Sequence, residues 1–181
     1  KDAIDFDKPI GCSSLRRQLQ LRRLFPQAKL APIRGNVLTR LRKLDDGEYS
    51  ALVLAAAGLH RLGLESRISR YFEPEEILPA AGQAILAVQA RKGVDTTCLG
   101  GFSDPDGRDC LLAERAFVRA LGGGCSSPAA AYATVSGGCI TLKGMYVATD
   151  QQLYFETVSG KRAEGELLGT KLAEQMRRKS Q

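Results

Sequence analysis

The first part of the chain alternates short apolar runs with amphipathic segments. Three apolar runs suit buried strands, at residues 8–12, 29–33 and 50–57. Two helices are predicted between them, at 15–25 and 37–46, and a further turn and helix follow at 58–70. Because strand and helix alternate regularly, this pattern predicts a parallel α/β sheet.

The second part of the chain has a different order of elements. We expect another buried strand at 84–88, a loop over 92–108 that is rich in glycine, aspartate, threonine and proline, and a helix over 109–121. Three strands then follow at 131–135, 140–148 and 153–158, with a last helix at 164–178. Since the strand connections are too short for crossovers, these three strands should form an antiparallel sheet in a C-terminal α+β domain.

Positive charge is concentrated near the start of the chain. The net charge is +6, and residues 1–43 hold 11 Lys and Arg against 3 Asp and Glu, whereas residues 44–181 hold 15 against 17. This asymmetry favours an anionic partner, with a solvated basic face as the alternative. There is no Trp and only 6% of residues are aromatic, so base stacking on nucleic acid is poorly served. No apolar run is long enough to cross a bilayer.

The five cysteines give no metal-binding pattern. They are scattered without a Cys-x-x-Cys pair, and His60 is the single histidine, so we expect no metal site. An odd number of cysteines favours a reducing, cytosolic setting. Cys125 stands out because it follows three glycines and precedes Pro128, on a loop where a large group could approach the backbone. The alternative is an inert buried cysteine beside a glycine helix cap.

Arginines recur at the predicted strand-to-helix junctions. Arg16 and Arg17 follow Ser13 and Ser14, at the start of the first helix, and the others are Arg34, after the second strand, and Arg40, in the second helix. In an open α/β sheet, ligands bind beyond the carboxyl ends of the strands, where helix N-termini also favour anions. Guanidinium groups there suit carboxylates or phosphates. No Walker loop or Gly-x-Gly-x-x-Gly is present, so a nucleotide is not specifically indicated.

Six motifs in this order resemble the porphobilinogen deaminase (hydroxymethylbilane synthase) family over nearly the whole chain. They are Gly11-Cys12-Ser13-Ser14-Leu15-Arg16-Arg17, Arg34-Gly35-Asn36-Val37 with Thr39-Arg40-Leu41, Leu54-Ala55-Ala56-Ala57-Gly58-Leu59, Leu78-Pro79-Ala80-Ala81-Gly82-Gln83, Glu114-Arg115-Ala116-Phe117 and Gly123-Gly124-Cys125. Each motif alone is weak, and the six together are specific.

The resemblance implies a cofactor site. Members of the family join four porphobilinogen units head to tail, with loss of ammonia, on a dipyrromethane cofactor that a thioether attaches to the cysteine matching Cys125. Residues that match the ligands of the cofactor and substrate carboxylates are Ser14, Arg16, Arg17, Arg34 and Arg40. Ser13 and Gly58 match neighbouring binding positions, and Gln83 lies in the matching interdomain segment.

The resemblance also implies that part of the enzyme is missing from this sequence. The family's catalytic aspartate stabilises the cationic intermediate and handles the pyrrole protons, and we find no match for it, so we expect no turnover by this chain alone. The implied domains are 1–74, an incomplete periplasmic-binding-protein-like α/β domain, 75–92, a segment that crosses to a mostly absent domain, and 93–181, the domain that carries Cys125.

The chain departs from the family pattern at four places: His60 replaces a lysine, Ala84 a glycine and Gly122 a common glutamate, and Ser126-Ser127-Pro128 differs from the commoner Gln-Val-Pro. His60 is expected to face solvent or to lie behind the ligand residues. The resemblance further implies a cytoplasmic, typically monomeric protein with porphobilinogen as substrate and with no nucleic-acid or membrane partner. Two other hypotheses stay open, a non-catalytic anion-binding module of the same fold and a nucleic-acid binder that uses the basic first quarter.

Overall fold

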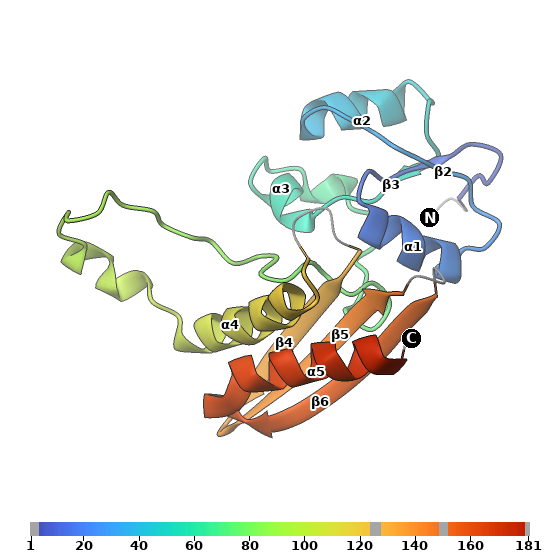
Figure 1. Ribbon diagram of the computed structural model, residues 1–181. Helices are drawn as coiled ribbons and strands as arrows, with labels where there is room; N and C mark the ends of the chain where they lie inside the picture. The colour runs from blue at the N-terminus through green and yellow to red at the C-terminus, as the bar shows by residue number, and fades with distance from the viewer. Residues whose placement is uncertain (1–3, 124–127, 149–151, 180–181) are drawn as a thin grey trace. The chain divides into compact units, whose positions relative to one another are not determined.

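The computed structural model describes residues 4–123, 128–148 and 152–179, which divide into two compact units. The first unit covers the described residues up to Ile77 together with Pro128, and the second covers the other described residues from Leu78 onward. Figure 1 shows the elements of both units along the chain, coloured from blue to red. Each unit is described by itself below.

The first unit is built on a parallel three-stranded sheet of order β2-β1-β3. Its elements are β1 (Ile10–Gly11), α1 (Leu15–Leu24), β2 (Leu30–Ala31), α2 (Val37–Asp45), β3 (Ala51–Leu52), α3 (Ala56–His60) and the short 3-10 helix η1 (Glu65–Arg67). The central strand pairs Ile10 with Leu30 on one side and with Ala51 on the other. The predicted parallel α/β order is therefore confirmed, although the paired part of each strand is shorter than the apolar run that contains it.

Side chains of the neighbouring residues pack closely on Gly11 in the central strand. A Cβ at this position would lie 2.6 Å from Leu52 Cδ2 and 3.0 Å from Tyr49 Cδ1, so a side chain here would require these two side chains to move. The apolar core of the unit joins Cys12, Leu21 and Ile77, all buried. This core therefore includes Cys12, the residue that follows the carboxyl end of β1.

The second unit is a two-layer α+β structure. It contains η2 (Thr97–Phe102), α4 (Pro105–Ala120), β4 (Ala130–Ser136), β5 (Cys139–Val147), β6 (Leu153–Lys161), η3 (Arg162–Glu164) and α5 (Gly165–Lys179). The strands form an antiparallel sheet of order β4-β5-β6, and Figure 1 shows α4 and α5 lying across one face of it. The predicted three-stranded antiparallel sheet and final helix are confirmed.

Close helix packing covers this sheet. Gly169 of α5 lies against the backbone of α4, because a Cβ there would be 2.4 Å from the carbonyl oxygen of Ala113 and 3.0 Å from the amide nitrogen of Phe117. Phe117 and Leu172 are fully or almost fully buried between the helices and the sheet. Figure 1 shows the two helices side by side, as this contact requires.

Three predicted boundaries or elements are wrong. Residues 84–88 form no strand, and Leu86 and Val88 are 75% and 67% exposed, because no described segment pairs with this apolar run. The predicted helix at 58–70 is replaced by α3, which begins earlier at Ala56, and by η1. Helix α4 begins at Pro105 instead of residue 109, because Asp104 caps it by accepting the N–H groups of Asp106 and Gly107, each at 3.1 Å.

Candidate anion-binding site

Three loops meet at the carboxyl edge of the parallel sheet. Each of the strands β1, β2 and β3 leads through a loop into the helix that follows it, α1, α2 and α3 respectively. Since the strands are parallel and in register, the three loops lie at the same edge. This is the edge that the sequence pattern predicted for a ligand.

Helices α1 and α2 begin at this edge and direct unpaired backbone N–H groups toward it. Asn36 caps α2, its Oδ1 accepting the N–H of Thr39 at 2.8 Å, whereas Ser14 at the start of α1 makes no such side-chain cap. Neither helix has an acidic residue in its first turn. The positive ends of both helix dipoles are therefore available to an anion.

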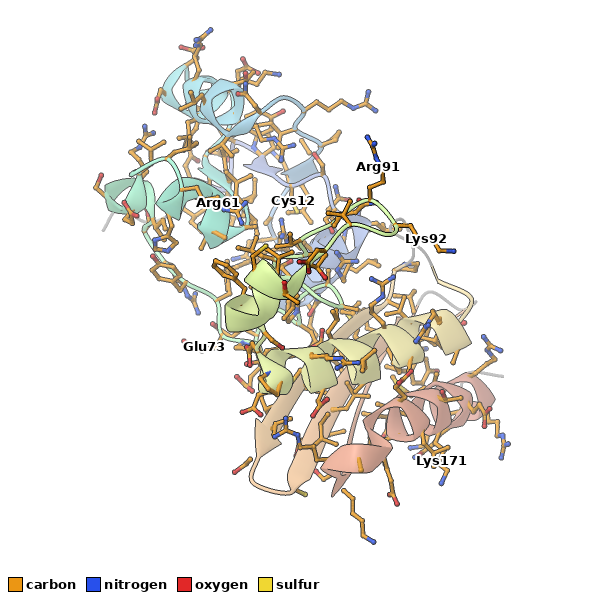
Figure 2. All side chains as sticks on the ribbon, turned by 90° about the vertical axis from the view of Figure 1, so that its left-hand side faces the viewer. Cys12, Arg61, Glu73, Arg91, Lys92 and Lys171 are labelled. Carbon is orange, nitrogen blue, oxygen red and sulfur yellow. The ribbon has the colours of Figure 1, made fainter. Side chains whose placement is uncertain are left out.

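Two of the predicted arginines influence one buried thiol through their charge. Cys12 is 0% exposed, and burial raises the pKa of its thiol, while the positive charges of Arg17 and Arg40 oppose that rise. The charges of two arginines on different helices therefore act on the same thiol, at the residue that follows β1. Figure 2 labels Cys12 within the first unit.

The other two arginines lie on the same loops and helix starts. Arg34 is exposed on the loop from β2 to α2, and Arg16 is half-buried in the first turn of α1. Arg40 is held in place because its Nε donates to the carbonyl oxygen of Gly35 at 2.8 Å. Gly35 has φ +113°, which favours glycine, and a Cβ there would be 2.8 Å from Thr39 Cγ2.

Ser13 joins two of the loops. Its hydroxyl donates to the carbonyl oxygen of Ile33 and accepts the N–H of Ile33 at 3.0 Å, so the end of β1 is fixed to the end of β2. Gly58 lies in α3, where a Cβ would be in ordinary contact with Val37 Cγ2 at 3.4 Å. Ser13 thus has a structural role that sequence reasoning missed, and Gly58 lies beside the first residue of α2.

The remaining predicted positions belong elsewhere. Gln83 is exposed on a turn of the second unit, and Cys125 lies outside the described residues. Gly122 lies two residues after α4 ends and has φ +71°. Its N–H donates to the carbonyl oxygen of Arg119 at 2.9 Å, and the N–H of Gly123 donates to the carbonyl oxygen of Val118 at 3.0 Å. This glycine ending is the helix cap considered in the sequence, and it closes α4 shortly before the cysteine.

His60 lies in an exposed cluster of its own. Its Nδ1 is 3.2 Å from Glu65 Oε1, and the hydroxyl of Tyr71 is 3.1 Å from its Nε2. The rings of His60 and Tyr71 stack with centroids 6.1 Å apart. These contacts connect α3 to the segment after it, and they agree with the expected solvent-facing position.

Two shallow surface hollows, of about 410 and 450 Å³, lie on α5 and on the outer faces of α4 and α5, and none of the predicted site residues lines them. Within 4–123, 128–148 and 152–179, no cluster of three or more His, Cys, Asp or Glu side chains could hold a metal ion. No helix in the described part of the chain has the length and apolar character needed to span a membrane.

The fold defines an α/β unit that carries several arginines at the carboxyl edge of its parallel sheet, and a separate α+β unit. The family profile "Porphobilinogen deaminase, dipyromethane cofactor binding domain" matches residues 2–98, and "Porphobilinogen deaminase, C-terminal domain" matches residues 108–178. The chain therefore belongs to the porphobilinogen deaminase family, as the sequence motifs indicated.

Individual relatives agree with this assignment. Porphobilinogen deaminase from Alkaliphilus oremlandii is 56% identical over 173 residues, which are 96% of this chain and 58% of the relative. The proteins of that name from Acetivibrio thermocellus and Ruminiclostridium josui are 55% and 58% identical over 97% and 94% of this chain, and 60% and 59% of their own lengths. The chain thus spans about three fifths of the relatives that it matches.

Proposed function

We propose that this chain is the carboxylate-binding and cofactor-carrying part of a porphobilinogen deaminase. The complete enzyme would join four porphobilinogen units head to tail, with loss of ammonia, into hydroxymethylbilane for haem biosynthesis. The observation that carries the proposal is that α1 and α2 both begin at one sheet edge and carry Arg17 and Arg40, whose charges both act on the thiol of Cys12. The family membership specifies which anion such a site would bind.

The donors at this edge fit the proposed ligand. Porphobilinogen and dipyrromethane carry acetate and propionate side chains, and a guanidinium binds a carboxylate through two parallel hydrogen bonds. Arg16, Arg17, Arg34 and Arg40 would each bind carboxylate groups, and the N–H groups that begin α1 would supplement them. Ser14 would contribute its hydroxyl, because it makes no helix cap with its side chain.

The remaining proposed residues act from the surrounding loops. Ser13 would keep the β1 and β2 loops at a fixed separation through Ile33, and Gly58 would keep side-chain atoms out of the space beside α2. Gln83 would contact the ligand from its exposed turn. Cys125 would hold the dipyrromethane through a thioether, and that group, when bound, supplies the pyrrole end to which new units are joined.

The catalytic carboxylate would come from outside this sequence. The domains we propose are 1–74 and 93–181, with 75–92 crossing to a further domain that holds the aspartate. The exposure of Leu86 and Val88 supports this, because an apolar run left in solvent suits a segment that packs against another domain. We therefore propose that the chain by itself binds porphobilinogen without turning it over. We also propose that the complete enzyme is a cytoplasmic monomer.

A binding titration tests the carboxylate site. Replacing Arg17 with Leu should weaken the affinity for porphobilinogen about tenfold to a hundredfold, because a charge-assisted hydrogen bond contributes about 1.5–3 kcal/mol. Arg22→Leu is the matched control, since Arg22 is exposed in the last turn of the same helix, and should bind as the wild type does. Equal affinities of the two variants would contradict the site.

Intact-protein mass tests the cofactor. Chain purified from a host that makes haem should carry the added mass of a dipyrromethane, and Cys125→Ser should lack it. A wild-type chain of unmodified mass would contradict the tether and favour the non-catalytic anion-binding module. Titration with a single-stranded oligonucleotide at two salt concentrations tests the hypothesis that the chain binds nucleic acid. That hypothesis requires the affinity to fall steeply as the salt concentration rises.

A further inference from the structure

Glu114 is a buried carboxylate that the proposed function does not use. It lies on α4 with 6% of its surface exposed, and the other buried polar side chain of the described residues is Gln20, in the first unit. Burying a carboxylate is costly unless hydrogen bonds replace its water. The hydrogen bonds that replace this water therefore indicate the role of Glu114.

Both carboxylate oxygens accept backbone N–H groups from distant parts of the chain. Oε1 accepts from Ala133 at 2.8 Å and Oε2 accepts from Gly82 at 2.6 Å. Ala133 belongs to β4, an edge strand of the antiparallel sheet, whose outward N–H groups have no strand partner. Glu114 thus connects α4, the edge of the sheet and the turn that contains Gly82.

That turn has a backbone conformation that needs outside support. Gly82 has φ +72° and Ala84 has φ +74°, and Ala84 is the one non-glycine residue with positive φ in the described part of the chain. The turn closes through hydrogen bonds from Gln83 to Ala80 at 2.9 Å and from Ile85 to Gly82 at 3.2 Å. An alanine in the left-handed region is disfavoured, so the turn 80–85 persists because its surroundings hold it.

Helix α4 provides that support at two neighbouring positions. Leu111 packs so closely on the turn that a Cβ at Gly82 would lie 2.6 Å from Leu111 Cδ1, and Glu114 lies three residues further along the same helix. Helix α4 ends at Ala120, five residues before Cys125 in sequence. The same helix therefore holds the turn that carries Gln83 and leads into the loop of the proposed cofactor cysteine.

We propose that Glu114 is a positioning residue, whose two backbone hydrogen bonds hold the turn 80–85, and with it Gln83, in place on α4. The role for Gln83 rests on the proposed function, whereas the holding of the turn does not. Glu114 need not contact the ligand, because it acts through Gly82.

Hydrogen exchange on the full chain tests the holding of the turn. Glu114→Gln keeps the shape of the side chain but replaces one acceptor oxygen with an amide donor, so one of the two N–H groups loses its partner. Exchange of the amides of Gly82, Gln83 and Ile85 should accelerate about tenfold to a hundredfold, while those of β5 keep their protection. Glu166→Gln is the control, because Glu166 is an exposed glutamate of the same unit.

The outcomes separate a local role from general destabilisation. Unchanged exchange in the turn of Glu114→Gln would overturn the proposal. If Glu114→Gln also loses β5 protection, Ala84→Gly in the wild-type background decides, because glycine relieves the left-handed strain and should slow exchange of the turn amides several-fold. If the turn amides of Ala84→Gly exchange as fast as those of the wild type or faster, the proposal is overturned.

Porphobilinogen binding tests the link to Gln83. Glu114→Gln should weaken binding several-fold, Glu166→Gln should leave it unchanged, and adding Ala84→Gly to Glu114→Gln should restore part of it. A loosened turn with unaltered binding would overturn the positioning role. Failure of the wild-type chain to bind porphobilinogen would instead contradict the proposed function, and the exchange result would stand independently.

Discussion

Replacing Gly169 with Ala should destabilise the C-terminal unit, because this glycine is where α5 approaches the backbone of α4. The new Cβ would lie 2.4 Å from the carbonyl oxygen of Ala113, about 1 Å closer than ordinary contact allows, and 3.0 Å from the amide nitrogen of Phe117. Backbone atoms of a helix cannot rotate away as a side chain can. The two helices must therefore separate, and the packing around Phe117 and Leu172 loosens.

The magnitude follows from two opposing effects. Overpacking of a well-packed core costs about 1–3 kcal/mol. Ala is favoured over Gly in a helix interior by about 1 kcal/mol, which offsets part of that cost. Because the new contact is with helix backbone, the overpacking cost should lie at the upper end of its range, and we expect a net loss of about 2 kcal/mol in the free energy of unfolding, measured by urea denaturation followed by circular dichroism.

A second glycine in the same unit gives the control. Gly138 lies outside the left-handed region, and a Cβ there would meet nothing within 4 Å, so Gly138→Ala should change the free energy of unfolding by less than about 0.5 kcal/mol. If Gly169→Ala is as stable as Gly138→Ala, the close packing of α5 on α4 is wrong.

Two further predictions concern titratable groups. Iodoacetamide should modify the exposed Cys98 and Cys139 in the native chain but spare Cys12, which is fully buried with a raised pKa, until denaturant is added; peptide mapping that shows equal rates would contradict this burial. Burial also raises the pKa of Glu114 above 4.5, so the folded state holds this proton more tightly than the unfolded state. Protonation of Glu114 should therefore stabilise the folded state fully below pH 4.5, and this stabilisation should be lost as pH rises through the higher folded pKa. The neighbouring thiol of Cys110, whose pKa is raised from 9.0, stays protonated over this range. The stability of the wild type relative to Glu114→Gln should therefore fall across this range in urea titrations, and a pH-independent difference would refute it.

The sequence was sufficient for those elements whose signals are local. Asn36 predicts the start of α2 because its side chain caps the helix three residues away, and that hydrogen bond is present at 2.8 Å. The arginines at strand-to-helix junctions could be assigned to one edge, since strand order and parallel pairing bring the loops together. Chain order alone therefore predicted the cationic edge.

Signals that depend on a distant partner were misread or missed. The run 84–88 has the composition of a buried strand, but a strand requires a neighbour, and none of the described segments pairs with it. Glu114 reads as an ordinary helical glutamate, because its two N–H donors lie 19 and 32 residues away in the sequence. Its one local signal is an acid between the buried residues Ala113 and Ala116 on the apolar face of α4.

The end of α4 is fixed from both sides of the helix. Arg177 of α5 donates to the carbonyl oxygen of Ala120 at 2.7 Å, and the N–H of Gly123 satisfies Val118 at 3.0 Å. Carbonyl groups that would otherwise be unpaired at a helix end are thereby satisfied, so the chain leaves α4 from a fixed point. Substitutions that disturb this end, such as Arg177→Ala, should therefore affect retention of a group on Cys125, whereas substitutions of Arg17 should affect affinity for carboxylates.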